Sequence, residues 1–150
     1  MSFLTTSGAF LSTASDGKEN TMTISWGFVG VIWGAPHFIC AVRPQRYTKE
    51  IIDKANSFTV SVPWGGLTKE LGICGSQSGR DINKGEVVKF VPGKKVDSPV
   101  VADCQTYFEC EIDYVTPLDG NGLTPDVRKT MYNGDYHTLY FGKIVETYGE

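Results

Sequence analysis

Short runs of alternating hydrophobic and polar residues, separated by turn residues, fill the first third of the chain. Alternation of this kind is typical of half-buried β-strands. It predicts strands at 8–14, 21–27, 28–33 and 36–43. Asp16-Gly17 is a common hairpin dipeptide, and it lies directly after the first of these runs. The chain is therefore predicted to begin as a meander of antiparallel strands.

Helical spacing of apolar residues interrupts the strands twice. A short helix is predicted over 48–56, with Thr48 as its N-cap. Residues 58–62 alternate as a further strand, and a second brief helix is predicted at 68–74 behind Thr68. Two small helices are thus expected among the strands.

The second half of the chain contains two irregular segments. Residues 75–85 are polar and glycine-rich, which predicts a surface loop. Residues 116–136 carry prolines, glycines and asparagines that are typical of turns. Residues 137–147 then resume the pattern of a strand.

Alternation is cleanest at 106–115, which is predicted to be a strand with one buried and one wet side. The buried side would carry Phe108, Cys110, Ile112 and Tyr114. The wet side would carry Glu109, Glu111 and Asp113. Many short strands with two small helices predict a mostly β fold, a closed or nearly closed barrel forming one domain over 1–150.

Composition indicates the size of the domain and argues against several classes of partner and location. A chain of 150 residues with 41% hydrophobic and 21% charged residues is typical of one globular domain. Its net charge of -3 and scattered basic residues offer no face for a polyanion, which argues against nucleic acid as a partner. The N-terminus lacks a signal-peptide pattern, and no apolar stretch reaches the roughly 18 residues of a membrane span. We therefore expect a cytoplasmic protein without a membrane segment.

The spacing of cysteine and histidine indicates no metal site. Neither a Cys-x-x-Cys pair nor a Cys/His metal pattern is formed by the four cysteines, Cys40, Cys74, Cys104 and Cys110. His37 and His137 are the only histidines. We expect reduced, structural thiols and no bound metal.

Three of the four arginines lie in the two segments that least resemble plain scaffold. The first segment is Arg43-Pro44-Gln45-Arg46-Tyr47-Thr48, where a predicted strand ends and a predicted helix begins. Guanidinium groups, a hydroxyl and free helix N–H groups converge there, and together they suit a phosphate. The alternative is a pair of surface arginines beside an ordinary capped helix.

The second segment, Ser78-Gly79-Arg80-Asp81-Ile82-Asn83-Lys84, adds hydroxyl, guanidinium and ammonium donors. Its glycine allows backbone N–H groups to approach an anion. Neither Gly-x-x-x-x-Gly-Lys-Ser/Thr nor Gly-x-Gly-x-x-Gly after a strand occurs, which removes the usual P-loop and dinucleotide-binding interpretations. A plain solvated loop is the alternative.

A third segment, Asn20-Thr21-Met22-Thr23-Ile24-Ser25-Trp26-Gly27, alternates apolar with hydroxyl-bearing residues. It suits a ledge of backbone and hydroxyl groups that hydrogen-bonds a flat heterocycle. Trp26, Trp33 and Trp64 are candidates to stack on such a ring. The alternatives are a half-exposed strand, and tryptophans that pack in the core.

In this order and with this spacing, the three segments resemble the flavin reductase-like family of FMN-binding split barrels, flavoredoxin-type members included. The resemblance covers nearly the whole chain, and it also includes Gly8-Ala9-Phe10-Leu11 and Phe58-Thr59-Val60-Ser61. It implies a Greek-key-like antiparallel split barrel that forms a homodimer. It also implies FMN bound non-covalently in a groove near the subunit interface.

The resemblance further implies roles for individual residues. Contacts with the isoalloxazine ring fall to Met22, Thr23, Ile24, Ser25 and Trp26. Contacts with the ribityl chain and phosphate fall to Arg43, Arg46, Tyr47, Thr48, Ser78, Gly79, Arg80 and Lys84. Gly134-Asp135-Tyr136-His137 is similar to a Gly-Asp-His segment that many relatives place near the nicotinamide. Here Tyr136 interrupts it, so the candidate catalytic role of His137 departs from the family pattern.

The function implied is that of an NAD(P)H:flavin oxidoreductase. NADH or NADPH would pass a hydride to bound FMN, which would reduce free flavin, a metal complex or a partner protein. One alternative is a flavoredoxin-like electron carrier without nicotinamide turnover of its own. Another is a flavin- or ligand-binding module without catalysis.

Overall fold

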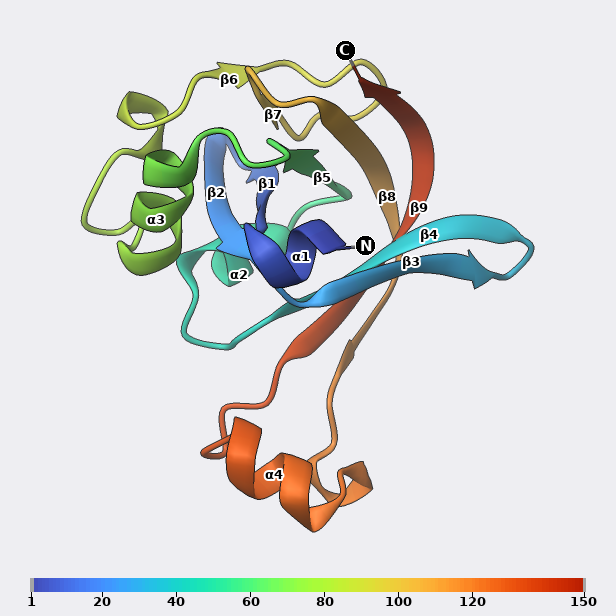
Figure 1. The fold of residues 1–150 in the computed structure, drawn as a ribbon. Helices are drawn as coiled ribbons and strands as arrows, with labels where there is room; N and C mark the ends of the chain where they lie inside the picture. Colours follow the sequence, from blue (N-terminus) through green and yellow to red (C-terminus); the bar gives the residue numbers. More distant parts are fainter. Residues whose placement is uncertain (1, 150) are drawn as a thin grey trace.

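A computed structural model describes residues 2–149, so the ends of the predicted domain, residues 1 and 150, lie outside the described part. One antiparallel sheet is built from seven strands: β1 (Ala9–Ser15), β2 (Lys18–Ile24), β3 (Gly27–Ile32), β4 (Ala35–Val42), β5 (Ser57–Val62), β8 (Thr106–Pro117) and β9 (Thr138–Gly149). Their order is β2-β1-β5-β8-β9-β4-β3. The predicted mostly β barrel with short helices is confirmed. It is a split barrel, because its edges are β2 and β3, which follow one another along the chain (Figure 1).

The predicted first hairpin is confirmed. Asp16 and Gly17 have positive φ angles of 51° and 73°, as the two-residue turn of a twisted hairpin requires. Ser15 pairs with Lys18 across this turn, so β2 begins three residues before its predicted start at 21. The pairing places Thr21 opposite Ser12 on a side that other elements cover.

Two helices occupy the predicted helical positions, α2 (Tyr47–Ile52) and α3 (Thr68–Ser76). Their predicted caps are wrong. Arg46 is the N-cap of α2, and α3 begins after Leu67, whose φ is 49°. Thr48 lies inside α2, where its buried hydroxyl accepts a 2.9 Å hydrogen bond from Nδ2 of Asn20. That bond fixes the start of α2 to β2.

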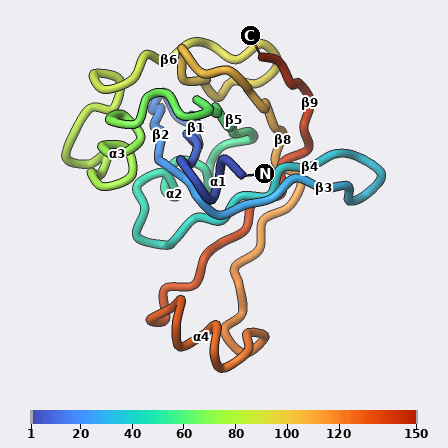
Figure 2. The backbone as a smooth tube through the Cα atoms, in the orientation of Figure 1, coloured from blue at the N-terminus to red at the C-terminus, as the bar shows by residue number. Residues whose placement is uncertain are grey.

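Several short elements escaped the sequence pattern. They are α1 (Ser2–Thr6), the 3₁₀ turns η1 (Lys84–Glu86) and η2 (Gly120–Gly122), the paired strands β6 (Phe90–Val91) and β7 (Val100–Val101), and helix α4 (Pro125–Met131). The segment 118–136, which we call the arm, carries η2 and α4 between β8 and β9. It extends away from the barrel (Figure 2), and no residue of α4 is buried.

The two sides of β8 differ from the predicted buried and wet sides. Glu109 is fully buried, because the N–H groups of residues 94–96 cover it and donate hydrogen bonds to its carboxylate. Tyr114, which was expected in the core, is 49% exposed. The strand has left the barrel there and leads toward the arm (Figure 1).

Two clusters of buried side chains form the core. The larger joins all the long strands except β3 and includes Phe58 and Tyr140. The smaller includes Phe10 and Leu71 and packs α3 and β7 against the other face of β1. The sheet is therefore covered on both faces near β1, and α3 is held close to the end of β2.

All four cysteines are free and buried, as predicted. Burial raises the pKa of each thiol, so these side chains stay protonated at neutral pH. Within residues 2–149, no three or more His, Cys, Asp or Glu side chains gather in a group that could hold a metal ion. None of the helices in this part of the chain is long and apolar enough to cross a membrane.

Candidate functional site

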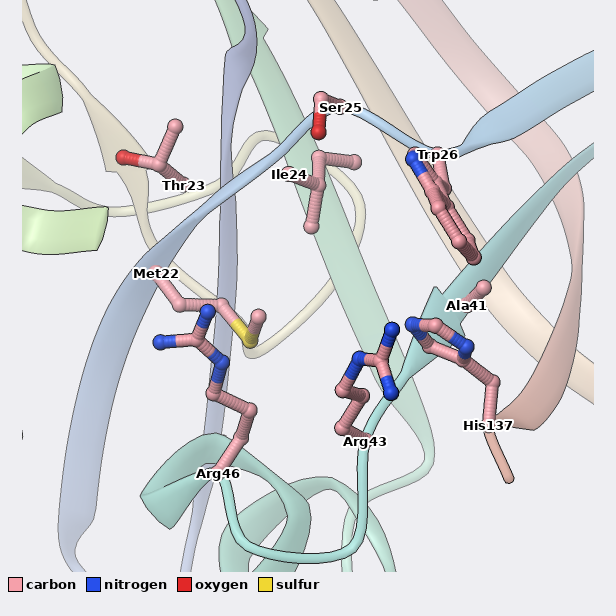
Figure 3. Close-up of a pocket in the computed structure, with 9 residues that line it drawn as sticks. All are labelled: Met22, Thr23, Ile24, Ser25, Trp26, Ala41, Arg43, Arg46 and His137. Carbon is pink, nitrogen blue, oxygen red and sulfur yellow. The ribbon is translucent and has the colours of Figure 1, made fainter. Parts of the chain in front are cut away.

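Every residue to which the resemblance assigns a role lines one of two adjoining pockets. The β2 pocket has a volume of about 250 Å³ and is lined by Met22, Thr23, Ile24, Ser25, Trp26, Ala41, Arg43, Arg46 and His137 (Figure 3). The loop pocket has a volume of about 260 Å³ and is lined by Asn20, Met22, Gln45, Arg46, Tyr47, Thr48, Ser76, Gln77, Ser78, Gly79, Arg80 and Lys84. Met22 and Arg46 belong to both. Together the pockets fall in the range of small-molecule sites, roughly 300–1,000 Å³.

The end of β2 and its link to β3 form one wall of the β2 pocket. At two positions of the predicted ledge, the hydroxyl groups donate hydrogen bonds to the protein itself. Thr21 Oγ1 donates to the carbonyl oxygen of Leu11, and Thr23 Oγ1 donates to that of Leu71 at 2.6 Å. These two hydroxyls hold β1 and α3, and Ser25 lies in the same wall.

All three tryptophans are exposed, so the alternative that they pack in the core is wrong. Trp26, 40% exposed, lines the β2 pocket. Trp33 lies at the tip of the β3–β4 hairpin. Trp64 lies just after β5 and donates its indole N–H to Thr106. Only Trp26 therefore stays a candidate to contact a bound ring.

Arg43 lies between the barrel and the arm. Its Nη1 donates to Oδ2 of Asp135 at 2.6 Å, and its Nη2 donates to the carbonyl oxygen of Met131. The N–H of Asn133 and the guanidinium of Arg43 hold the pKa of Asp135 at about 2. Arg43 also lies over the ring of Trp26, 5.6 Å from its centroid. It therefore lines the β2 pocket and not the loop pocket.

His137 lies at the start of β9, where the arm rejoins the barrel. Its imidazole is tilted against Trp26 with centroids 4.8 Å apart, and Nδ1 lies 2.8 Å from the hydroxyl of Tyr132. Burial and the nearby Arg43 lower the pKa of His137 to about 4. The histidine is thus a neutral group in the pocket wall at neutral pH.

The lowered pKa of His137 predicts that stability falls in mild acid. Between pH 6.5 and about 4, the unfolded chain protonates this histidine while the folded chain does not. The stabilisation that comes from neutral His137 is fully present above pH 6.5. As the pH falls, the free energy of unfolding decreases by up to about 3 kcal/mol. Urea unfolding of wild type and His137→Gln across this range measures it. A difference between the two proteins that stays constant with pH would contradict the prediction.

The loop pocket gathers donor groups from α2 and the loop after α3. Arg46 donates from Nη1 to the carbonyl oxygen of Gly75 at 2.9 Å, which holds its guanidinium between the two pockets. Arg80 forms an ion pair with Glu50 and lies over the ring of Tyr47. Both predicted arginines of this pocket are therefore held in place by neighbouring groups.

Lys84 differs from a surface lysine, because it is 95% buried. Its ammonium donates to the carbonyl oxygens of Thr21 at 2.9 Å and Cys74 at 2.8 Å. Burial lowers the pKa of Lys84. This lysine joins β2 to α3 and also lines the loop pocket. The sequence pattern did not predict the first of these roles.

Sequence reasoning also missed several residues of the site. Asn20, Ala41, Gln45, Ser76 and Gln77 line the pockets, and Tyr132 and Asp135 support them from the arm. Asn20 and Gln45 lie within segments that the sequence did single out. Asp135 belongs to the Gly134–His137 segment that the sequence also singled out, but Tyr132 gave no signal, because its role depends on how the arm folds back.

Chemically, the two pockets differ. The loop pocket combines guanidinium, ammonium, amide and hydroxyl donors, which suit an anion with several oxygens. The β2 pocket combines the rings of Trp26 and His137 with strand backbone, which suits a flat ring with polar edges. Arg46 stands at the junction of the two.

Comparison with known proteins identifies relatives of this chain. Residues 1–150 match the model of the flavin reductase-like domain family. An uncharacterised protein of Pyrococcus abyssi is 31% identical over 144 residues, which cover 94% of this chain and 73% of that protein. An FMN-binding protein of Thermus thermophilus with bound p-hydroxybenzaldehyde has a TM-score of 0.76 at 23% identity, over 95% of this chain and 71% of that one. A flavoredoxin of Methanosarcina acetivorans has a TM-score of 0.75 at 24% identity, over 95% and 68% of the two chains.

Proposed function

This chain belongs to the flavin reductase-like domain family, and we propose that it binds FMN and exchanges electrons through it as an NAD(P)H-dependent oxidoreductase. The observation that carries the proposal is the adjacency of the two pockets. A site for a flat ring joins a site rich in cationic donors, and Arg46 lines both. FMN has these two ends, a planar ring and a phosphate, joined by a ribityl chain.

The described residues fit this cofactor. Gly79 packs directly against Asn20 and Tyr47, and because a Cβ at this position would collide with both, glycine lets the loop lie close to the donors of β2 and α2. Arg46 donates to Gly75 from Nη1 alone and keeps donors for phosphate oxygens, whereas Nε and Nη2 of Arg80 already donate to Glu50. Ser25 and the strand backbone at 22–26 offer polar groups to the edge of a ring.

Bound FMN would supply the redox chemistry, which leaves binding and orientation to the protein. Arg46 would hold the phosphate side, since its guanidinium is already fixed by Gly75. Trp26 and His137 would confine the ring and limit its access to water. Arg43, neutralised by Asp135, keeps the wall formed by the arm in place.

A side chain at Gly79 is expected to weaken FMN binding. In Gly79→Ala, the new Cβ would overlap the amide oxygen of Asn20 and lie 2.6 Å from Cδ1 of Tyr47. Asn20 is buried and bonded to Thr48, so the loop must move instead. We expect FMN affinity to fall by about tenfold or more, since overpacking costs about 1–3 kcal/mol. Fluorescence titration with FMN measures the change.

Gly72→Ala is the matched control for this variant. Nothing lies within 4 Å of a Cβ at Gly72, and alanine favours the helix α3 in which it lies. FMN affinity should therefore stay at the wild-type value. Equal affinities of both variants would argue against the loop as part of the site.

We also propose that two copies of the chain pair across the β3 edge. In residues 2–149, this edge lacks a neighbouring strand and exposes Phe28, Val29, Val31 and Trp33. Val31 is 79% exposed. An apolar edge strand of this kind is a template for pairing with another chain.

A charge on this edge is expected to separate the copies. Light scattering should give the mass of a dimer for wild type and that of a monomer for Val31→Lys. The control is Val127→Lys on the exposed helix α4, which should stay dimeric. A monomeric wild type would contradict this assignment.

The test of the function itself is spectroscopic. The purified protein is mixed with FMN, freed of unbound flavin, and its visible absorbance is followed without oxygen after addition of NADH or NADPH. Retained flavin bands that bleach within seconds would support the oxidoreductase. Retained bands that persist would favour an electron carrier, and a colourless protein would contradict FMN binding.

A further inference from the structure

The arm contributes one hydrogen bond to the histidine of the β2 pocket. The hydroxyl of Tyr132 lies 2.8 Å from Nδ1 of His137, and the two rings meet at 80°. On its other side, His137 packs against Trp26. Figure 3 places the imidazole beside the guanidinium of Arg43 in the wall of the pocket. The orientation of this ring is thus fixed by its neighbours.

The number of protons on the pair decides what each nitrogen can do. Burial raises the pKa of Tyr132, so the phenol keeps its proton. Burial and Arg43 keep His137 neutral by lowering its pKa to about 4, so its ring carries one N–H. Two protons are therefore distributed over three atoms, the phenol oxygen, Nδ1 and Nε2.

Hydrogen-bond partners select one distribution. Among residues 2–149, the hydroxyl of Tyr132 has no other hydrogen-bond partner than His137. The lone pair of an imidazole nitrogen accepts more strongly than a phenol oxygen, so Tyr132 donates to Nδ1. The ring proton then lies on Nε2, which makes no hydrogen bond within the described chain.

We propose that Tyr132 is a positioning residue that holds His137 in its Nε2–H tautomer, so that His137 donates a hydrogen bond to a carbonyl oxygen of the molecule in the β2 pocket. The other charged groups of this pocket agree with a donor role. Arg43 and Arg46 are donors, and the nearby carboxylate of Asp135 already accepts from Arg43. The pocket therefore favours a planar ring whose carbonyl edge faces the arm.

The tautomer can be measured without any ligand, so this test is independent of the proposed function. Nitrogen NMR of the flavin-free, ¹⁵N-labelled protein reports which imidazole nitrogen carries the proton, and His137→Gln identifies the signals. We expect Nε2–H in wild type and a mixture of tautomers in Tyr132→Phe. An Nδ1–H ring in wild type, or an unchanged ring in Tyr132→Phe, would overturn the proposal.

Tyr136→Phe is the matched control. The ring of Tyr136 packs on Tyr132, but the hydroxyl of Tyr136 makes no hydrogen bond to His137. The tautomer should be that of wild type in this variant. A change equal to that of Tyr132→Phe would assign the effect to packing in the arm and overturn the positioning role.

The consequence for the bound molecule rests on the proposed function and has its own readout. In the FMN-loaded protein, Tyr132→Phe should slow bleaching by NADH roughly tenfold, as expected for one lost hydrogen bond. Tyr136→Phe should bleach at the wild-type rate. Equal rates in all three proteins would overturn the donor role of His137, whereas failure to bind FMN would overturn the proposed function and leave the tautomer result intact.

Discussion

Glu109→Ala should lower the free energy of unfolding by about 3 kcal/mol or more, since each buried donor left without an acceptor costs about 1–3 kcal/mol. Its carboxylate accepts hydrogen bonds from the N–H groups of Lys94, Lys95 and Val96, and from the hydroxyl of Tyr148 at 2.7 Å. All four donors would lose their acceptor. Burial by itself raises the pKa of Glu109, but these hydrogen bonds lower it below the usual value. The stabilisation is therefore present at neutral pH and is lost as the pH falls through the acidic range.

Glu111→Ala is the matched control two residues along the same strand. Glu111 is exposed, so its removal should change stability by no more than about 0.5 kcal/mol. Urea unfolding at pH 7 and pH 4 measures both variants. Equal effects of the two substitutions at pH 7 would contradict the role assigned to Glu109.

Arg46→Ala should weaken FMN binding more than any other single substitution in the site. Loss of a charge-assisted contact costs about 1.5–3 kcal/mol, which corresponds to a roughly 10- to 150-fold loss of affinity. Arg46 is the arginine that lines both pockets, so no neighbouring cation replaces it at the junction. The dissociation constant follows from the quenching of FMN fluorescence.

Arg128→Ala removes the same charge from α4, where Arg128 is exposed and lines neither pocket. It should bind FMN like wild type. Thermal unfolding of the flavin-free proteins checks that Arg46→Ala still folds. If the two variants bound FMN equally, Arg46 would not hold the phosphate end of the cofactor.

The strands of the barrel follow from the sequence because their alternation reflects local burial. The position of Asp16-Gly17 was equally readable, since a two-residue turn needs positive φ angles. The segments that line the two pockets could be singled out because donor-rich stretches stand out against an apolar scaffold. These are properties that a short stretch of chain displays by itself.

Other features depend on distant parts of the chain and could not be predicted. Glu109 has the pattern of a wet position, and only the loop at 94–96 makes it buried. Lys84 looks like a surface cation, and only the approach of α3 to β2 gives it two carbonyl partners. Helix α4 did have a local signal, because Thr124 caps it and Pro125 begins it, but the surrounding turn residues obscured that signal.

The arm has few contacts of its own, since α4 buries no residue. It is attached to the barrel at Arg43 and His137, and these two side chains also line the β2 pocket. A molecule that contacts both would add free energy to the attachment of the arm as well as to its own binding. Occupancy of the pocket and local order of the arm are therefore thermodynamically linked, and each strengthens the other by the same amount.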